Sequence, residues 1–305
     1  MKTLRFLVSL TTNDNDYQRE QAKEAQEAAR RFGVDADIIY ANNDSVNQSQ
    51  QLLQAIQSSL AERHDAIIFE PVGGTAFPIV ARAAAEAGIG WVVLNRDVDY
   101  IAEIRKAHNV PVFGITSNHG EIGRIQGRQF AALLPKGGSI LYIEGPSGSS
   151  AARQRTAGMN ETRPANLQIR TLRGEWTSES AQHAVQAWLR LSTSLKTPID
   201  LIGCQCDAMA LGARKAFQEL EDSPDKERWL RLPYTGCDGL PQGGQEWVRE
   251  GLMAATVVVP ANTGLAIEML VKAFQNKQQP PEETLTTANS HPPIETLAAN
   301  APKGA

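Results

Sequence analysis

Two apolar runs decide the fold class of this chain: Ala66-Ile67-Ile68-Phe69 and Gly90-Trp91-Val92-Val93-Leu94. A strand without polar alternation is typical of a parallel sheet that helices cover on both faces. Between the two runs, residues 77–87 are alanine-rich and stop at Gly88, a pattern that predicts a helix. The stretch therefore predicts a strand, a helix and a second, parallel strand.

The same alternation extends back to the N-terminus. Residues 4–10 and 34–40 are β-rich runs, and residues 18–31 and 45–63 carry helical patterns. Four β-α units in succession indicate an α/β protein with a doubly wound parallel sheet.

The alternation of strand and helix patterns is interrupted over residues 97–118, where a short helical stretch precedes the apolar run 112–115. A second series of β-α units follows. Its expected elements are helices at 121–134, 149–162, 178–192, 208–220, 242–250 and 264–274, and strands at 139–143, 168–172, 200–204, 231–237 and 254–259. A further short strand is expected near 285–288. Two α/β halves of similar rhythm fit a chain of 305 residues, because a typical domain has about 150.

Composition and charge favour a small-molecule partner. The chain has 42% hydrophobic and 21% charged residues and a formal net charge of -4, without the basic face or arm of a duplex-DNA binder. No run of about 18 apolar residues is present that would span a membrane. Three cysteines, Cys204, Cys206 and Cys237, are too few for a disulfide framework and lack the spacing of a zinc site. We expect buried thiols, no metal and no cofactor.

Open α/β sheets bind their ligands beyond the carboxyl ends of the strands, so the candidate site consists of the residues that directly follow each strand. The candidates after the strands are Asn13, Asn15, Tyr17, Asn95, Arg96, Trp176, Cys206, Asp207, Asp238 and Asn262, together with the loop 145–149 and with Arg153 and Arg155 on the helix that follows this loop. A polyol requires bidentate donors and acceptors for its hydroxyls and an aromatic face for its C–H surface. Each residue alone is also explained as a cap, a turn or a solvated charge. Their convergence on one predicted edge favours a polyol site.

Catalytic machinery is not apparent in the sequence. The Gly/Ser-rich segment 145–149 lies between a strand and a helix, but it lacks the lysine of a P-loop and the G-x-G-x-x-G spacing. The five histidines are scattered, and none stands with an acid or a nucleophile in a readable arrangement. We therefore expect that the protein is not an enzyme.

Three motifs resemble the ribose/galactose-type periplasmic sugar-binding proteins of ABC transporters. They are Ser149-Ser150-Ala151-Ala152-Arg153-Gln154-Arg155-Thr156-Ala157-Gly158, Asp207-Ala208-Met209-Ala210-Leu211-Gly212-Ala213 and Thr235-Gly236-Cys237-Asp238-Gly239. The ligand-binding cores of lactose-repressor-like regulators share the same type I fold. The resemblance covers residues 4–274.

This resemblance implies two doubly wound parallel-sheet lobes, joined by a multi-strand hinge, with a ligand cleft between them. The N-terminal lobe would comprise residues 1–116 and 260–286, and the C-terminal lobe residues 117–259 and 287–305.

The resemblance also assigns roles in the N-terminal lobe. Asn15 and Tyr17 match polar and aromatic contacts from the first loop, and Gln18 stands where a second aromatic residue often does. Asn95 and Arg96 match an Asp-Arg pair that grips ring hydroxyls.

Four further roles are implied for later positions. Arg155 matches a bidentate sugar contact, whereas Arg153 is expected to be structural. Trp176 matches an aromatic wall, and Asp238 matches an acceptor on the hinge side of the cleft.

Three departures from the family pattern bear on the ligand. Cys206 replaces an asparagine, residues 257–260 stand where a glutamine commonly follows the late strand, and Asn95 removes the charge of the Asp-Arg pair. Asn262 is a candidate substitute for the glutamine. An unmatched buried polar group costs about 1–3 kcal/mol, so these changes favour a less hydroxylated or more apolar ligand than ribose.

The expected function is that of a solute-binding protein, which captures a sugar or sugar derivative by hinge closure and delivers it to an ABC importer permease. The alternatives are a ligand-sensing ectodomain that partners a membrane sensor, or the effector domain of a transcription regulator without its helix-turn-helix. We expect a monomer in the periplasm or another extracytoplasmic space, with no nucleic acid partner and no membrane insertion. No charged and apolar leader precedes the first strand, so the sequence does not itself show a signal peptide.

Overall fold

The computed structural model describes residues 3–72, 77–191, 194, 197–221 and 224–300. The chain forms two compact units, here called unit 1 (Met1–Ser117 and Ala261–Thr286) and unit 2 (Asn118–Pro260 and Thr287–Ala305). It passes from one unit to the other at residues 117–118, 260–261 and 286–287. Among the described residues, no helix combines the length and apolar character needed to cross a membrane.

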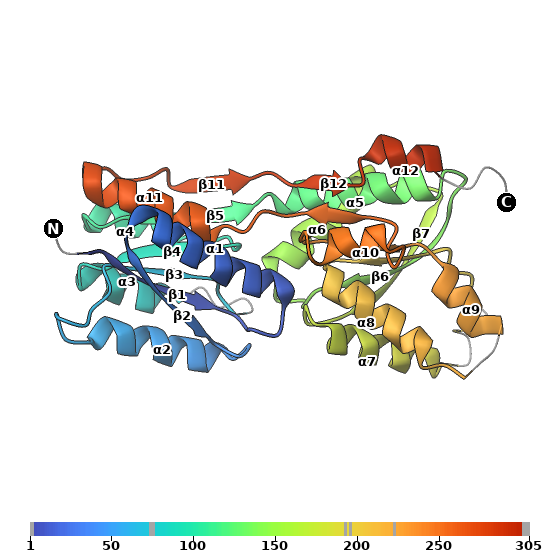
Figure 1. The fold of residues 1–305 in the computed structure, drawn as a ribbon, viewed down its shortest axis with the longest axis horizontal. Coiled ribbons are helices and arrows are strands. Elements are labelled where there is room, and N and C mark those ends of the chain that lie inside the picture. The colour runs from blue at the N-terminus through green and yellow to red at the C-terminus, as the bar shows by residue number, and fades with distance from the viewer. Residues whose placement is uncertain (1–2, 73–76, 192–193, 195–196, 222–223, 301–305) are drawn as a thin grey trace. The chain divides into compact units, whose positions relative to one another are not determined.

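Unit 1 has a six-stranded sheet in the order β11-β5-β4-β3-β1-β2, and all neighbouring strands are parallel (Figure 1). The strands are β1 (Arg5–Leu10), β2 (Asp35–Tyr40), β3 (Ala66–Phe69), β4 (Gly90–Leu94), β5 (Val112–Ser117) and β11 (Glu283–Thr286). The helices are α1 (Asp16–Phe32), α2 (Ser45–Gln57), α3 (Pro78–Glu86), α4 (Ile101–Ala107) and α11 (Thr263–Asn276).

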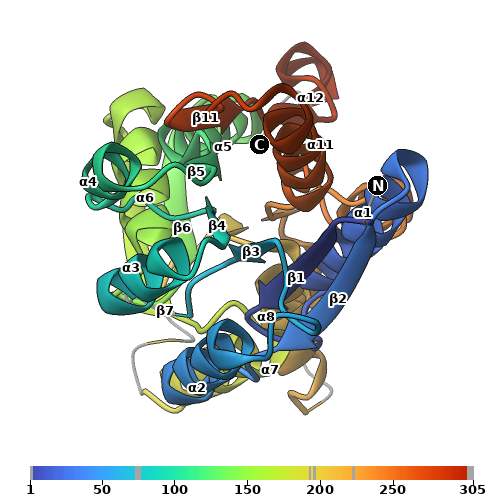
Figure 2. The same ribbon diagram turned by 90° about the vertical axis from the view of Figure 1, so that its left-hand side faces the viewer.

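Helices cover both faces of this sheet, which explains why its central strands are wholly apolar. Ile68 of β3 packs with α1 and α11, whereas its neighbour Ile67 points to the other face and packs with α2, α3 and α4. Figure 2 shows these two helical layers on opposite sides of the strands. Since successive side chains of a strand point to opposite faces, every residue of β3 and β4 is buried.

Unit 2 has a four-stranded parallel sheet in the order β7-β6-β8-β9 and a separate antiparallel pair, β10-β12. The strands are β6 (Gly138–Glu144), β7 (Leu167–Arg173), β8 (Leu201–Cys204), β9 (Tyr234–Thr235), β10 (Thr256–Val258) and β12 (Asn289–His291). The helices are α5 (His119–Leu133), α6 (Ser150–Thr162), α7 (Ser178–Leu189), α8 (Asp207–Gln218), α9 (Pro224–Arg231), α10 (Gly244–Arg249) and α12 (Ile294–Asn300).

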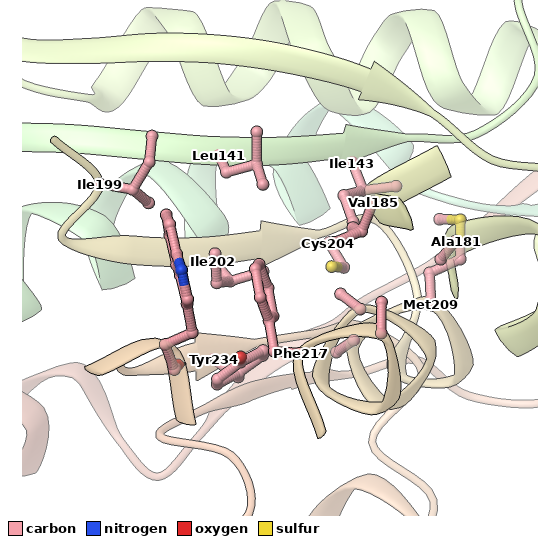
Figure 3. Close-up of a cluster of buried hydrophobic side chains, with 14 of the residues drawn as sticks. Leu141, Ile143, Ala181, Val185, Ile199, Ile202, Cys204, Met209, Phe217 and Tyr234 are labelled. Atoms are coloured by element: carbon pink, nitrogen blue, oxygen red, sulfur yellow. Dashed lines mark hydrogen bonds between the residues drawn. The ribbon is translucent and has the colours of Figure 1, made fainter. Parts of the chain in front are cut away.

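The core of unit 2 follows the same two-faced principle. Figure 3 shows Leu141 and Ile143 of β6 in one cluster with Ile202 and Cys204 of β8 and Phe217 of α8. The alternate residues of β6 pack on the opposite face, with α5 and α6. The carboxyl ends of all these parallel strands therefore share one edge of the sheet, and the loops at that edge lead into the helices.

The structure corrects two predicted elements. The helix expected at 45–63 ends at Gln57, because Ser58 adopts an extended conformation with ψ 155°. Within the strand expected at 231–237, only Tyr234–Thr235 forms a strand, and Arg231 is the last residue of helix α9. The proline at the start of α9 is compatible with a helix because its missing N–H lies in the first turn.

Candidate functional site

In unit 1, the predicted site residues gather around a buried acid, Glu70, which directly follows β3. One carboxylate oxygen of Glu70, Oε2, accepts hydrogen bonds from Gln18 Nε2 at 2.9 Å and from Asn95 Nδ2 at 3.0 Å. The other oxygen lies 3.5 Å from a guanidinium nitrogen of Arg96, and both side chains are nearly buried. Glu70 thus connects residues that follow β1, β3 and β4.

Asn95 occupies a strained position at the end of β4. Its φ of 56° lies in the left-handed region, which is uncommon for a residue other than glycine. Its amide nitrogen also lies 3.5 Å from the Tyr17 hydroxyl. Contacts with Tyr17, Glu70 and Asn262 hold this conformation.

Asn262 extends the cluster from the start of α11. Its Nδ2 donates to Asn95 Oδ1 at 2.6 Å, and its Oδ1 accepts from the Thr286 hydroxyl at 3.0 Å. Asn262 is fully buried, so the polar atoms of its side chain are used within unit 1. Its backbone N–H donates to Gln21 Oε1 at 2.8 Å, which ties α11 to α1.

Asn15, Tyr17 and Gln18, which were predicted as site residues after the first strand, differ in what they do. Asn15 is the N-cap of α1, because its Oδ1 accepts from the backbone N–H groups of Tyr17 and Gln18. Gln18 and Tyr17 are buried, and both contact the cluster around Glu70 through the bonds described above. The cap sets the direction in which the first turn of α1 presents these two side chains.

In unit 2, a cation and an aromatic ring form the centre of the predicted set. The guanidinium carbon of Arg155, on α6, lies 5.5 Å from the centroid of the Trp176 ring, which follows β7. Arg155 also donates to the backbone carbonyl of Gln205, directly after β8. The Gln205 side chain in turn accepts from Gly145 N at 2.9 Å and donates to the Ala152 carbonyl at 3.0 Å. Gln205 therefore fixes the loop after β6 to the start of α6.

The Trp176 ring packs directly on the backbone of Gly145. A Cβ atom at position 145 would overlap the indole six-membered ring, so only glycine fits beneath it. The tryptophan backbone has a φ of 65°, and its carbonyl accepts from Cys206 Sγ at 3.7 Å. Trp176 as a whole residue is half-buried.

Cys206 and Asp238 complete the predicted set in unit 2. Burial raises the pKa of the Cys206 thiol well above its ordinary value, and the negative charge of Asp238 raises it further. Asp238 has a φ of 117° and a bridge to Val258. All three cysteines are free and buried, in keeping with the expected buried thiols.

Asp207 organises the loop that carries Asp238. Its carboxylate accepts from the Thr256 hydroxyl at 2.6 Å and from Gly239 N at 2.7 Å, and its own N–H donates to the Cys237 carbonyl at 2.6 Å. Burial raises the pKa of the Asp207 carboxyl to about 7.

Two connecting residues, Glu70 and Gln205, were not predicted from the sequence, and each joins members of the set in its own unit. Both directly follow a buried strand, β3 and β8 respectively, at the edge where the candidate site was expected. The rule applied to the other strand ends would have found them. Their role as connectors, however, depends on contacts with other strands that the sequence does not display.

The described residues contain no group of three or more His, Cys, Asp and Glu side chains arranged to hold a metal ion. The two sets instead offer planar guanidinium groups, carboxylates, amides and an aromatic face, which suit hydrogen bonding to hydroxyl groups. Residues 6–278 match the model of the periplasmic binding protein domain family.

The chain belongs to this family. Among curated periplasmic binding proteins it is 25% identical to the D-allose-binding periplasmic protein of Escherichia coli, over 88% of this chain and 84% of that protein. It is 29% identical to the D-ribose/D-allose-binding protein of Pseudomonas aeruginosa, over 72% of this chain and 64% of that protein.

The fold is also that of solved type I periplasmic binding proteins, as predicted. A binding protein from Actinobacillus succinogenes with bound D-allose aligns with a TM-score of 0.80 and 22% identity, covering 97% of this chain and all of the other. This likeness confirms the predicted α/β architecture with two parallel sheets.

Proposed function

We propose that this periplasmic binding protein captures a small polyhydroxylated molecule, a sugar or a sugar derivative, and delivers it to an ABC importer. We further propose that it acts as a monomer in the periplasm or another extracytoplasmic space. The curated relatives bind sugars according to their names, which supports the ligand class.

The observation that carries the proposal is the contact between Arg155 and Trp176. A guanidinium held beside an indole offers directed N–H donors next to an apolar face. A sugar presents hydroxyl groups that accept from such donors, next to C–H surfaces that pack on such a face. The cluster around Glu70 in unit 1 offers a second set of donors and acceptors of the same kind. We propose that both sets act on the same ligand molecule and that the protein closes around it.

The role of each predicted side chain in this proposal follows from its contacts. Tyr17, Arg96, Arg155, Trp176 and Asp238 are proposed to touch the ligand. The side chains of Asn15, Gln18, Asn95, Cys206 and Asn262 bond mainly to the protein, and we propose that they position those contacts.

A thermal-shift screen with pentoses, hexoses, polyols, inositols and short glycosides tests the function. A ligand at 100 times its Kd adds about 2.7 kcal/mol of stability and raises the Tm by a few degrees. The hit is then repeated with Arg155→Met and with Arg153→Met, an exposed arginine on the same helix that serves as the matched control. Loss of the shift in the first variant alone supports the proposal, and a panel without any hit contradicts the ligand class.

A further inference from the structure

We propose that Glu70 is a specificity-determining residue: it balances the charge of Arg96, so that unit 1 favours uncharged polyhydroxylated ligands and rejects the corresponding carboxylic acids. This inference rests on the proposed function and names the ligand class of the same site.

Both charged side chains of the Glu70–Arg96 pair are nearly buried. The Arg96 side chain is 11% exposed and the Glu70 side chain 6% exposed, with 3.5 Å between guanidinium and carboxylate. A buried charge is unfavourable unless it has a partner of opposite sign. With Glu70 as that partner, the pair carries no net charge. Without Glu70, the guanidinium would attract an anionic group from the ligand.

The side chains that hydrogen-bond to Glu70 are uncharged amides, so they do not replace its negative charge. Glu70 Oε2 accepts from Gln18 and from Asn95, so the amide nitrogen of Asn95 faces the carboxylate. The Asn95 oxygen consequently faces Asn262, which donates to it. The neighbouring amides are thus oriented as donors toward Glu70 and supply polarity without charge.

A glutamine at position 70 is nearly isosteric with the glutamate. With its amide oxygen in the place of Oε2, it still accepts from Gln18 and Asn95, while the negative charge is lost. Glu70→Gln therefore separates the charge of Glu70 from its volume. Glu144 is a matched control in unit 2, because it also lies at the carboxyl end of a central strand, has a side chain that is only 11% exposed and lies 3.4 Å from an arginine, Arg173.

The experiment measures Kd by isothermal titration for wild type, Glu70→Gln, Glu144→Gln and the double variant Glu70→Gln/Arg96→Gln. The probes are D-galactose with D-galacturonate, D-glucose with D-glucuronate, and the neutral compound from the thermal-shift screen with its own acid. We expect wild type and Glu144→Gln to prefer the neutral partner of each pair. Glu70→Gln should shift the acid-to-neutral affinity ratio toward the acid by about tenfold or more, and the double variant should return it toward wild type.

Circular dichroism checks that each variant is folded. If Glu70→Gln does not fold, Arg96→Gln alone tests the inference, because it leaves Glu70 as the unbalanced charge. D-galactosamine should then gain affinity relative to D-galactose by a similar factor, and an unchanged ratio would overturn the inference.

The outcomes separate this inference from the proposed function. Binding of neutral sugars with an unchanged ratio in Glu70→Gln overturns the role of Glu70 and leaves the proposed function standing. A wild-type protein that prefers the acid also overturns the role of Glu70 and leaves the proposed function standing. Acid binding by Glu70→Gln, with no sugar bound by wild type, supports the role of Glu70 and contradicts the proposed function. Absence of binding by every variant contradicts both.

Discussion

Asn262 donates a hydrogen bond of 2.6 Å to the side-chain oxygen of Asn95, although 167 positions separate the two residues in the sequence. The bond joins the start of α11 to the end of β4, and it fixes the orientation of the Asn95 amide. The amide nitrogen then faces Glu70, at 3.0 Å. An uncharged side chain at position 95 is consequently matched to a charged one at position 70.

Asn95→Asp should therefore destabilise the protein, although an aspartate at this position matches the family pattern. The new carboxylate would lie beside that of Glu70 and lose a donor, with an expected cost of about 1–3 kcal/mol at pH 7. Urea unfolding measures the loss. The double variant Asn95→Asp/Glu70→Gln should recover most of it, and a single variant as stable as wild type would show that the two side chains are not coupled.

Gly145→Ala should weaken ligand binding through Trp176. The added methyl group overlaps the indole ring, which must then leave its position beside Arg155. Overpacking of this kind costs about 1–3 kcal/mol. Gly148→Ala, in the same loop with open space around its Cβ, is the matched control. Titration calorimetry should show weaker binding for the first variant only, and equal affinities would contradict a ligand-contacting Trp176.

Asp207 should make stability depend on pH. Its folded pKa of about 7 exceeds the ordinary value of 3.8, so between these values the folded state holds a proton that the unfolded state releases. The contribution of this group to stability therefore falls as pH rises from about 4 to 7, by at most about 1.4 kcal/mol per pH unit. Urea unfolding at several pH values measures the slope.

Asp207→Asn should remove that part of the slope, whereas Asp35→Asn, at an exposed position on β2, should not. An identical pH dependence in wild type and Asp207→Asn would show that the carboxyl titrates alike in the folded and unfolded states.

The thiols should resist alkylation in the folded protein. Cys204, Cys206 and Cys237 are buried, and burial raises the pKa of each thiol, so little reactive thiolate forms near pH 8. Iodoacetamide followed by mass spectrometry should find the native chain unmodified and the urea-unfolded chain modified at all three positions. Rapid labelling of native Cys206 would mean that its position after β8 is open to solvent.

The sheet architecture was predictable because its signal is local. In β3 and β4 every side chain is buried, and the resulting apolar runs are visible in the sequence without any tertiary information. Element ends were less predictable where one backbone conformation decides them. Ser58 ends α2 by adopting extended geometry, and no glycine or proline marks that residue.

The candidate site was predictable as a set of strand ends, and the roles of its members as ligand contacts stay predictions. Sequence reasoning placed Asn95 and Arg96 there, but it interpreted Asn95 as the loss of a charge. In the structure Glu70 lies against Arg96, and Glu70 supplies a carboxylate from the end of the neighbouring strand. Such compensation depends on the pairing of β3 with β4, and a residue-by-residue match to a family pattern does not include it.

The most direct test of the account is the stoichiometry of ligand binding. Isothermal titration of the best neutral compound from the screen should give one molecule per wild-type chain. Arg96→Gln in unit 1 and Arg155→Met in unit 2 should each weaken that single event by tenfold or more, by the loss of about 1.4 kcal/mol or more. Two binding events, each abolished by only one of the variants, would contradict a ligand shared by both clusters, and no binding at all would contradict the proposed function.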